Sequence, residues 1–266
     1  MKQQRFHTFL CMLGALLFAS ASLCHAAEKG AKGAKSAISG KPWTYSGKTG
    51  PDHWDKLEKD FEQCKLGQFQ SPIDIPDAST RKGDFPSLLF VYKPSPLRII
   101  DNGHAIQVNY APGSTFSVAG KRYELLQFQF HKPSEEKING RGRDMEVQLV
   151  HKGQDGKLGV IAVLLERGKE NALIKTLWDN IPKVKDKESV VEQTMINAVD
   201  LLPGNKGYYS FAGSLTTPPC SEDVTWYVFK TPVQLSAEQI ARFDKLYPMN
   251  ARPVQPVNGR DITATP

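Results

Sequence analysis

The runs YELLQFQFH (residues 123–131), DMEVQLVH (144–151) and LGVIAVLLE (158–166) decide the fold of this chain. Each is short, is rich in β-branched, aromatic or leucine residues, and is bounded by Pro, Gly or Asn, as strands are. The run LRIIDNGHAIQVNY (97–110) has the same character. The sequence therefore predicts mainly strands joined by long loops.

Two stretches have helical character instead. One lies around Asn171 to Asn180, and the other is SAEQIARFDKLY (236–247), where Ser236 and Gln239 form a capping box. We find no internal repeat, P-loop or dinucleotide-binding fingerprint. The expectation is one α+β domain, mainly β, built on a large sheet with a single core.

The N-terminus has the pattern of an export signal. Lys2 and Arg5 precede an apolar run over residues 8–23, which small residues follow at Ala26 and Ala27. Attachment of a lipid to Cys24 is the alternative, although Leu23 stands where a small residue is expected. We predict a periplasmic or secreted protein with a signal peptide at 1–26, a basic flexible linker at 27–40 and a folded domain at 41–266.

The composition limits the kinds of partner. The hydrophobic share of 40% supports a core, and the formal charge of +6 falls to +4 when Lys2 and Arg5 are removed with the signal. No second long apolar run exists, so we expect no membrane span. We expect no nucleic-acid partner either, because so small a charge attracts polyanions weakly.

Cleavage of the signal leaves two cysteines, Cys64 and Cys220. In an oxidising compartment they are expected to form one long-range disulfide, and two buried free thiols are the alternative.

Polar residues occupy one face of two predicted strands. Alternation places Gln127, Gln129 and His131 on the same face, opposite two phenylalanines. It also groups Glu146 with Gln148 on the later strand. If the strands are neighbours, Gln129, His131 and Gln148 converge on one pocket wall. The alternative is a hydrogen-bonded polar patch with no ligand.

A resemblance to a known family adds to this. The runs that carry it are WTYSGKTGPDHW (43–54), QSPIDI (70–75), DNGHAIQV (101–108), QFQFHKPSEE (127–136), MEVQLVHK (145–152), GSLTTPPCSE (213–222), VTWYVFKTP (224–232) and NARPVQPVNGR (250–260). In this order they resemble the α-class carbonic anhydrases, particularly the exported bacterial ones. The resemblance implies a large twisted, mostly antiparallel central sheet with short peripheral helices, a conical pocket, and pairing of Cys64 with Cys220.

The resemblance breaks at the metal ligands. The family holds zinc with three histidines, and here those positions are Gln129, His131 and Gln148. A glutamine carbonyl is a neutral, weaker donor than imidazole, and oxygen donors favour harder ions than zinc. We predict that zinc binding is weak or absent at this site.

The residues around the ligands match the family. Glu135 and Thr216 match the carboxylate and hydroxyl that orient zinc-bound hydroxide, and His104 matches the proton shuttle. Gln127 and Glu146 match groups that hold the ligands in place. The pocket that receives carbon dioxide is matched by Val150, Val160, Leu215, Thr217 and Trp226.

Three functions remain open. The favoured one is a carbonic-anhydrase-related protein with little or no hydration of carbon dioxide, which binds a small molecule or anion in the pocket or a protein partner. The second is an active zinc lyase that uses His131, Gln129 and Gln148 as ligands and interconverts carbon dioxide and bicarbonate. The third is a surface-adhesion module, whose linker lysines Lys29, Lys32 and Lys35 contact an acidic cell surface.

Overall fold

A single large sheet organises the part of the chain that the structure describes. The structure is a computed structural model, and it describes residues 43–266. Thirteen strands form the sheet, with the central order β11-β4-β5-β7-β9-β10-β13-β12-β15-β2. Most neighbours are antiparallel, while β10 runs parallel to both β13 and β14, and β15 runs parallel to β2. The predicted mainly β architecture with a large, mostly antiparallel sheet is confirmed.

The elements have the following bounds. The strands are β1 (Asp74–Ile75), β2 (Arg81–Lys82), β3 (Leu89–Val91), β4 (Ser95–Asp101), β5 (Ile106–Asn109), β6 (Thr115–Val118), β7 (Lys121–His131), β8 (Lys137–Ile138), β9 (Met145–Gly153), β10 (Leu158–Arg167), β11 (Ser189–Ile196), β12 (Tyr208–Gly213), β13 (Val224–Phe229), β14 (Val233–Leu235) and β15 (Thr263–Ala264). The α-helices are α1 (Gln63–Leu66), α2 (Ala172–Asp179) and α3 (Ala237–Asp244). All three helices are short, as expected.

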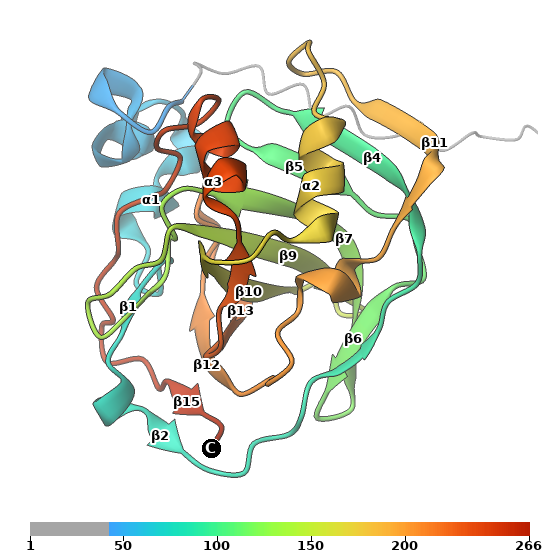
Figure 1. The fold of residues 1–266 in the computed structure, drawn as a ribbon. Coiled ribbons are helices and arrows are strands. Elements are labelled where there is room, and N and C mark those ends of the chain that lie inside the picture. The colour runs from blue at the N-terminus through green and yellow to red at the C-terminus, as the bar shows by residue number, and fades with distance from the viewer. Residues whose placement is uncertain (1–42) are drawn as a thin grey trace, which may run out of the picture. The chain divides into compact units, whose positions relative to one another are not determined.

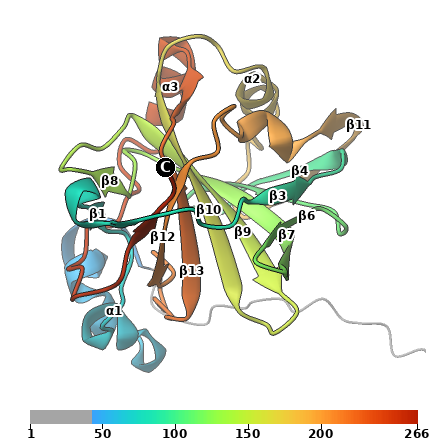
Figure 2. The ribbon, with the colours of Figure 1, turned by 90° about the horizontal axis from the view of Figure 1, so that it is seen from below.

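The helices α2 and α3 lie together over one face of the sheet (Figures 1 and 2). On this face the rings of Phe130 and Trp178 pack edge to face at 4.7 Å, and Trp178 stacks on Phe243 at 5.5 Å. Both helices begin where the sequence indicates: the Asn171 side chain caps α2, and Ser236 with Gln239 forms the capping box of α3. The apolar core therefore fixes one face of β7 and β9 and leaves the other for polar side chains.

The N-terminal aromatic segment is fastened to the loop after β12 by a disulfide between Cys64 and Cys220, whose Cα atoms are 4.9 Å apart. The expected pairing is confirmed. Trp43, Trp54 and Phe61 pack around it. The link holds the loop that carries Thr216 and Thr217, which lie just before Cys220.

Within residues 43–266, no helix is long and apolar enough to cross a membrane. The signal peptide at 1–26 and the linker at 27–40 lie outside the described residues and remain predictions.

The buried His151 gives the fold a pH dependence. Its Nδ1–H donates to the Leu149 carbonyl (2.9 Å) and its Nε2 accepts from the Tyr92 hydroxyl (2.7 Å) on the core face. Burial lowers the pKa of His151 from 6.5 to about 3. The unfolded chain therefore binds this proton before the folded one does, so stability is lost as the pH falls from 6.5 toward 3.

We expect this histidine to lower the free energy of unfolding by about 2 kcal/mol between pH 6.5 and pH 5. Urea unfolding of the protein and of His151→Gln at both pH values measures the contribution. The variant should lose less stability than the wild type over this interval. An equal loss in both proteins would contradict the assignment.

Candidate functional site

The polar face of β7 and β9 brings the predicted ligand positions together. Gln129 lies directly opposite Gln148 in the strand pairing, and His131 lies opposite Glu146. Gln127 pairs with Val150 in the same ladder. Gln129, His131 and Gln148 therefore lie on the same face of two neighbouring strands. Gln107 of β5, which pairs with Gln129 on its other side, also belongs to this polar face and was not predicted.

His131 is held by one hydrogen bond on the side away from the other ligand positions. The imidazole is fully buried, and its Nδ1 lies 2.8 Å from the backbone carbonyl oxygen of Asn250. A carbonyl only accepts, so the Nδ1 atom carries a proton. The Nε2 atom has no hydrogen-bond partner in the described chain. This is the atom by which the ring could bind a ligand.

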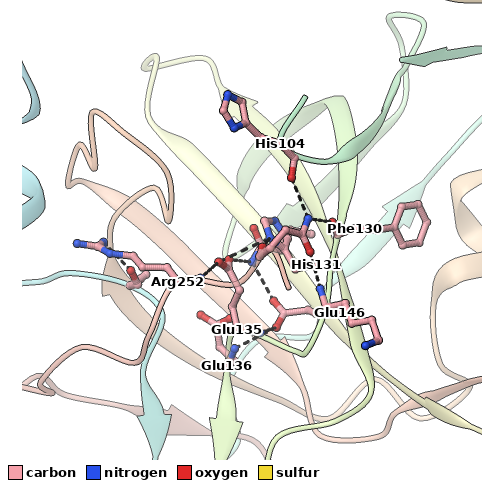
Figure 3. Close-up of polar contacts among 11 residues, drawn as sticks. His104, Phe130, His131, Glu135, Glu136, Glu146 and Arg252 are labelled. Carbon is pink, nitrogen blue, oxygen red and sulfur yellow. Dashed lines mark hydrogen bonds and ion pairs between the residues drawn. The ribbon is translucent and has the colours of Figure 1, made fainter. Parts of the chain in front are cut away.

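Asn250 fixes this arrangement from the loop that follows α3. Its side chain accepts from the Lys132 backbone N–H (2.7 Å) and donates to the carbonyls of His104 and Phe130, each at 3.0 Å (Figure 3). Three of these four bonds of the Asn250 carbonyl and side chain hold the end of β7, and the fourth ties it to the turn at His104. Sequence analysis missed this residue, although it lies within the quoted run NARPVQPVNGR.

Gln148 is oriented by two carboxylates. Its Nε2 donates to Glu135 Oε2 at 2.7 Å and to Glu146 Oε1 at 3.0 Å. Rotating the amide by 180° would place its carbonyl oxygen against both carboxylates, so the orientation is fixed by hydrogen bonding. The Gln148 carbonyl oxygen therefore turns away from the carboxylates.

Glu135 is engaged differently from the expectation. Its Oε1 accepts the backbone N–H of Arg252 at 2.7 Å, and its Oε2 accepts the Gln148 amide. The resemblance implied a bond from the Thr216 hydroxyl to Glu135. Among residues 43–266 no hydrogen bond joins these two side chains, and Glu135 accepts from Gln148 and Arg252 instead.

Three carboxyl groups are buried together here (Figure 3). Glu146 Oε2 accepts the backbone N–H groups of Glu135 (2.9 Å) and Glu136 (3.0 Å). Burial, together with the charge of the adjacent Glu146, raises the pKa of Glu136 well above 4.5. Burial and the charge of Glu135 also raise the pKa of Glu146 from 4.5, so these carboxyl groups hold protons more tightly in the folded chain than in the unfolded one.

The Arg252 guanidinium donates its hydrogen bonds to neutral oxygens and not to the buried carboxyl groups. It donates to Gln70 Oε1 and to the backbone carbonyls of Ser71 and Cys64 at 2.8–2.9 Å. Burial lowers its pKa to about 10, so it stays charged at neutral pH. Glu135 and Arg252 also line a cavity of about 380 Å³ beside the N-terminal segment, to which none of the three ligand positions contributes.

The predicted apolar wall is also assembled. Val160 of β10 pairs with Val150 on one side and with Trp226 on the other. Leu215 packs against the same cluster, and the Trp226 indole N–H donates to the Ser214 carbonyl at 3.0 Å. Thr217 is half-buried in the adjoining loop. This apolar wall lies on the same face of the sheet as Gln129, His131 and Gln148, which we call the polar floor.

His104 lies at some distance from the floor. Its ring stacks on Trp43 at 3.7 Å, and burial lowers its pKa from 6.5. In Figure 3 its imidazole points away from His131, and only its backbone carbonyl joins the network through Asn250. In this conformation His104 has no contact with the ligand positions.

The ligand positions do not match what zinc requires. Catalytic zinc sites use three strong nitrogen, sulfur or carboxylate donors, whereas this wall offers one imidazole nitrogen and two neutral amide oxygens. The nearby carboxylates Glu135 and Glu146 are turned toward the Gln148 amide and backbone N–H groups. Within residues 43–266, no group of three His, Cys, Asp or Glu side chains is placed to hold a metal ion.

Comparisons with known proteins place this site in a wider context. Residues 49–266 match the family model of eukaryotic-type carbonic anhydrases. A carbonic anhydrase of Nostoc sp. is 42% identical over 221 residues, which cover 82% of this chain and 84% of that protein. The α-carbonic anhydrase of Thermovibrio ammonificans, solved in complex with the inhibitor sulfanilamide, is 40% identical with a TM-score of 0.81, covering 84% of this chain and 99% of that one. Dioscorin complexed with ascorbate is 28% identical with a TM-score of 0.78, covering 84% and 98%.

Proposed function

Because the chain belongs to the eukaryotic-type carbonic anhydrase family, we propose that it is an exported member that binds a small molecule in its pocket and hydrates carbon dioxide little or not at all. The single observation that carries the proposal is the state of Gln148. Its two amide hydrogens are bound by Glu135 and Glu146, so it can offer a ligand only a neutral carbonyl oxygen. Gln129 offers another amide in place of a second imidazole.

The chemical consequence follows from how hydration is catalysed. Attack on carbon dioxide at neutral pH needs hydroxide, and a tightly held metal ion supplies it by lowering the pKa of bound water from 15.7 to about 7. One imidazole and two amides hold zinc weakly. The nearby carboxyl groups carry no positive charge that could stabilise a hydroxide, and Glu135 and Glu146 are held by backbone N–H groups and by Gln148.

The retained pocket supports a binding role. The wall formed by Val150, Val160, Leu215 and Trp226 persists although the metal ligands have changed. Dioscorin, which shares the fold, is described with ascorbate bound, so a protein of this fold can hold an organic ligand. Export to the periplasm or to the medium is part of the proposal and rests on the predicted signal at 1–26.

An active zinc lyase is the second candidate, and the observation that favours it is the convergence of Gln129, His131 and Gln148 on one wall. The Nostoc and Thermovibrio relatives are also described as carbonic anhydrases. The adhesion hypothesis depends on the linker at 27–40, which lies outside the described residues, and no observation favours it.

Zinc affinity separates the two candidates. The purified protein, stripped of metal, is titrated with zinc against a chromophoric chelator of nanomolar affinity. We expect the chelator to retain the zinc, and His131→Ala to behave as the wild type does. Stoichiometric withdrawal of zinc from the chelator, abolished by His131→Ala, would overturn the proposal and establish a functional metal site.

A further inference from the structure

We propose that the floor of this pocket binds a small primary ammonium group, R–NH3⁺, through His131 Nε2 and the side-chain carbonyl oxygens of Gln129 and Gln148. The inference rests on the proposed function, because a tightly bound zinc ion would occupy the same atoms. It specifies the chemistry of the ligand: a cation that carries three hydrogen-bond donors.

The first acceptor is His131. Its Nδ1–H is committed to the Asn250 carbonyl, so in the neutral ring the lone pair lies on Nε2. This atom is buried and has no partner in the described chain. Buried polar atoms without a partner are uncommon, and this one lies on the same sheet face as the half-buried Gln129, so it is a natural contact for a ligand that donates.

The second acceptor is Gln148, and the carboxylates behind it strengthen it. The amide hydrogens point to Glu135 and Glu146, so only the carbonyl oxygen remains for a ligand. Hydrogen bonds in a chain polarise one another, and a carboxylate at one end makes the carbonyl at the other end a better acceptor. A cation bound to that oxygen is stabilised by the dipole of the Gln148 amide, which the carboxylates of Glu135 and Glu146 align.

The charges near the floor favour a cation over an anion. Among the described residues, no Lys or Arg forms an ion pair with Glu135, Glu136 or Glu146, and the His131 ring, whose Nδ1 lies 3.6 Å from Glu135, is neutral when Nε2 accepts. The Arg252 guanidinium points to Gln70 and to backbone carbonyls instead. The lone pairs of the polar floor and the buried carboxyl groups therefore both favour a cation over an anion.

The arrangement of the acceptors matches an ammonium group. Gln129 lies directly opposite Gln148, and His131 follows two residues along the same face of β7. Side chains so related start about 5–7 Å apart, which leaves space for one nitrogen bonded to all three. An sp³ ammonium has three N–H donors in a tripod, and its fourth bond directs the substituent outward. Leu215, which is half-buried and packs against the buried cluster of Val150, Val160 and Trp226, offers apolar surface to an alkyl substituent.

A titration with n-propylammonium tests the inference directly. The ¹⁵N resonances of His131 are followed in the metal-free protein at pH 7.5, in an amine-free buffer that contains a chelator. We expect a saturable shift of the Nε2 resonance. Tetramethylammonium, a cation without N–H donors, and propionate, an anion of similar size, should produce none.

Variants identify the acceptors. Gln129→Leu removes one acceptor without touching the carboxylates, and we expect it to weaken propylammonium binding by about tenfold or more. Gln148→Leu should do the same. Gln154→Leu, on an exposed loop, is the matched control and should bind as the wild type does.

Each outcome bears on one hypothesis. Absence of a shift with propylammonium, an equal response to tetramethylammonium, or unchanged binding by Gln129→Leu would overturn the ammonium site. Zinc that binds at stoichiometric amounts and displaces no ammonium would instead overturn the proposed function. A protein that binds neither zinc nor propylammonium leaves the proposed function intact and rejects this inference alone.

Discussion

Restoring two histidines, by the double change Gln129→His and Gln148→His, is expected to raise zinc affinity on the order of a thousandfold or more, because three imidazoles then replace one imidazole and two amides. Both positions lie on the same polar face as His131 and directly oppose each other across β7 and β9. Glu146, whose backbone contacts already fix it, remains available to accept an N–H from a histidine at position 148, as carboxylates near metal-bound histidines do. Competition with a chelator and stopped-flow hydration measure the two gains.

Single changes and a distant control define the effect. Gln129→His alone should give an intermediate affinity, and Gln154→His, on the exposed loop, should give none. If the double variant binds zinc no better than the wild type, the geometry of the wall has also changed, and the two glutamines are not the cause of weak binding.

Replacing the buried Glu136 by glutamine is expected to stabilise the protein at neutral pH. Burial and the neighbouring Glu146 raise the pKa of Glu136 well above 4.5. Folding therefore costs free energy at pH values above 4.5, because the folded carboxyl holds its proton more tightly than the unfolded one. The cost is zero below pH 4.5, grows as the pH rises toward the folded pKa, and at pH 7.5 is at most about 4 kcal/mol.

Urea unfolding of Glu136→Gln and wild type from pH 4 to pH 8 measures this difference. The variant should gain stability over the wild type with rising pH and lose the advantage near pH 4.5. Glu62→Gln, on the exposed surface, is the control and should show no such trend. A constant difference at every pH would mean that the substitution acts through packing and not through the proton.

The face of each strand could be read from the sequence, because alternation in QFQFH and EVQLV leaves only one consistent assignment. The capping residues of α2 and α3 were predictable for a similar reason, since their contacts are local. The disulfide was predictable because the expected signal peptide leaves only two cysteines in an oxidising compartment, and the family resemblance implied the same pairing.

The hydrogen bonds by which Glu135, Asn250 and Arg252 hold the polar floor could not be predicted from the sequence. Glu135 follows a loop between β7 and β9, and whether it accepts from Thr216 or from Gln148 depends on distances that no local pattern encodes. Asn250 and Arg252 reach the site from more than a hundred residues away along the chain. Their only signal was the conspicuous run NARPVQPVNGR, which indicated the family but not the contacts.

Stopped-flow measurement of carbon dioxide hydration by the purified protein, with excess zinc and after metal removal, tests the central claim most directly. We predict a rate indistinguishable from buffer in both states, because one imidazole and two amides do not hold a catalytic zinc ion. A zinc-dependent rate that disappears in His131→Ala would contradict the claim and identify the protein as an active carbonic anhydrase with a one-histidine metal site.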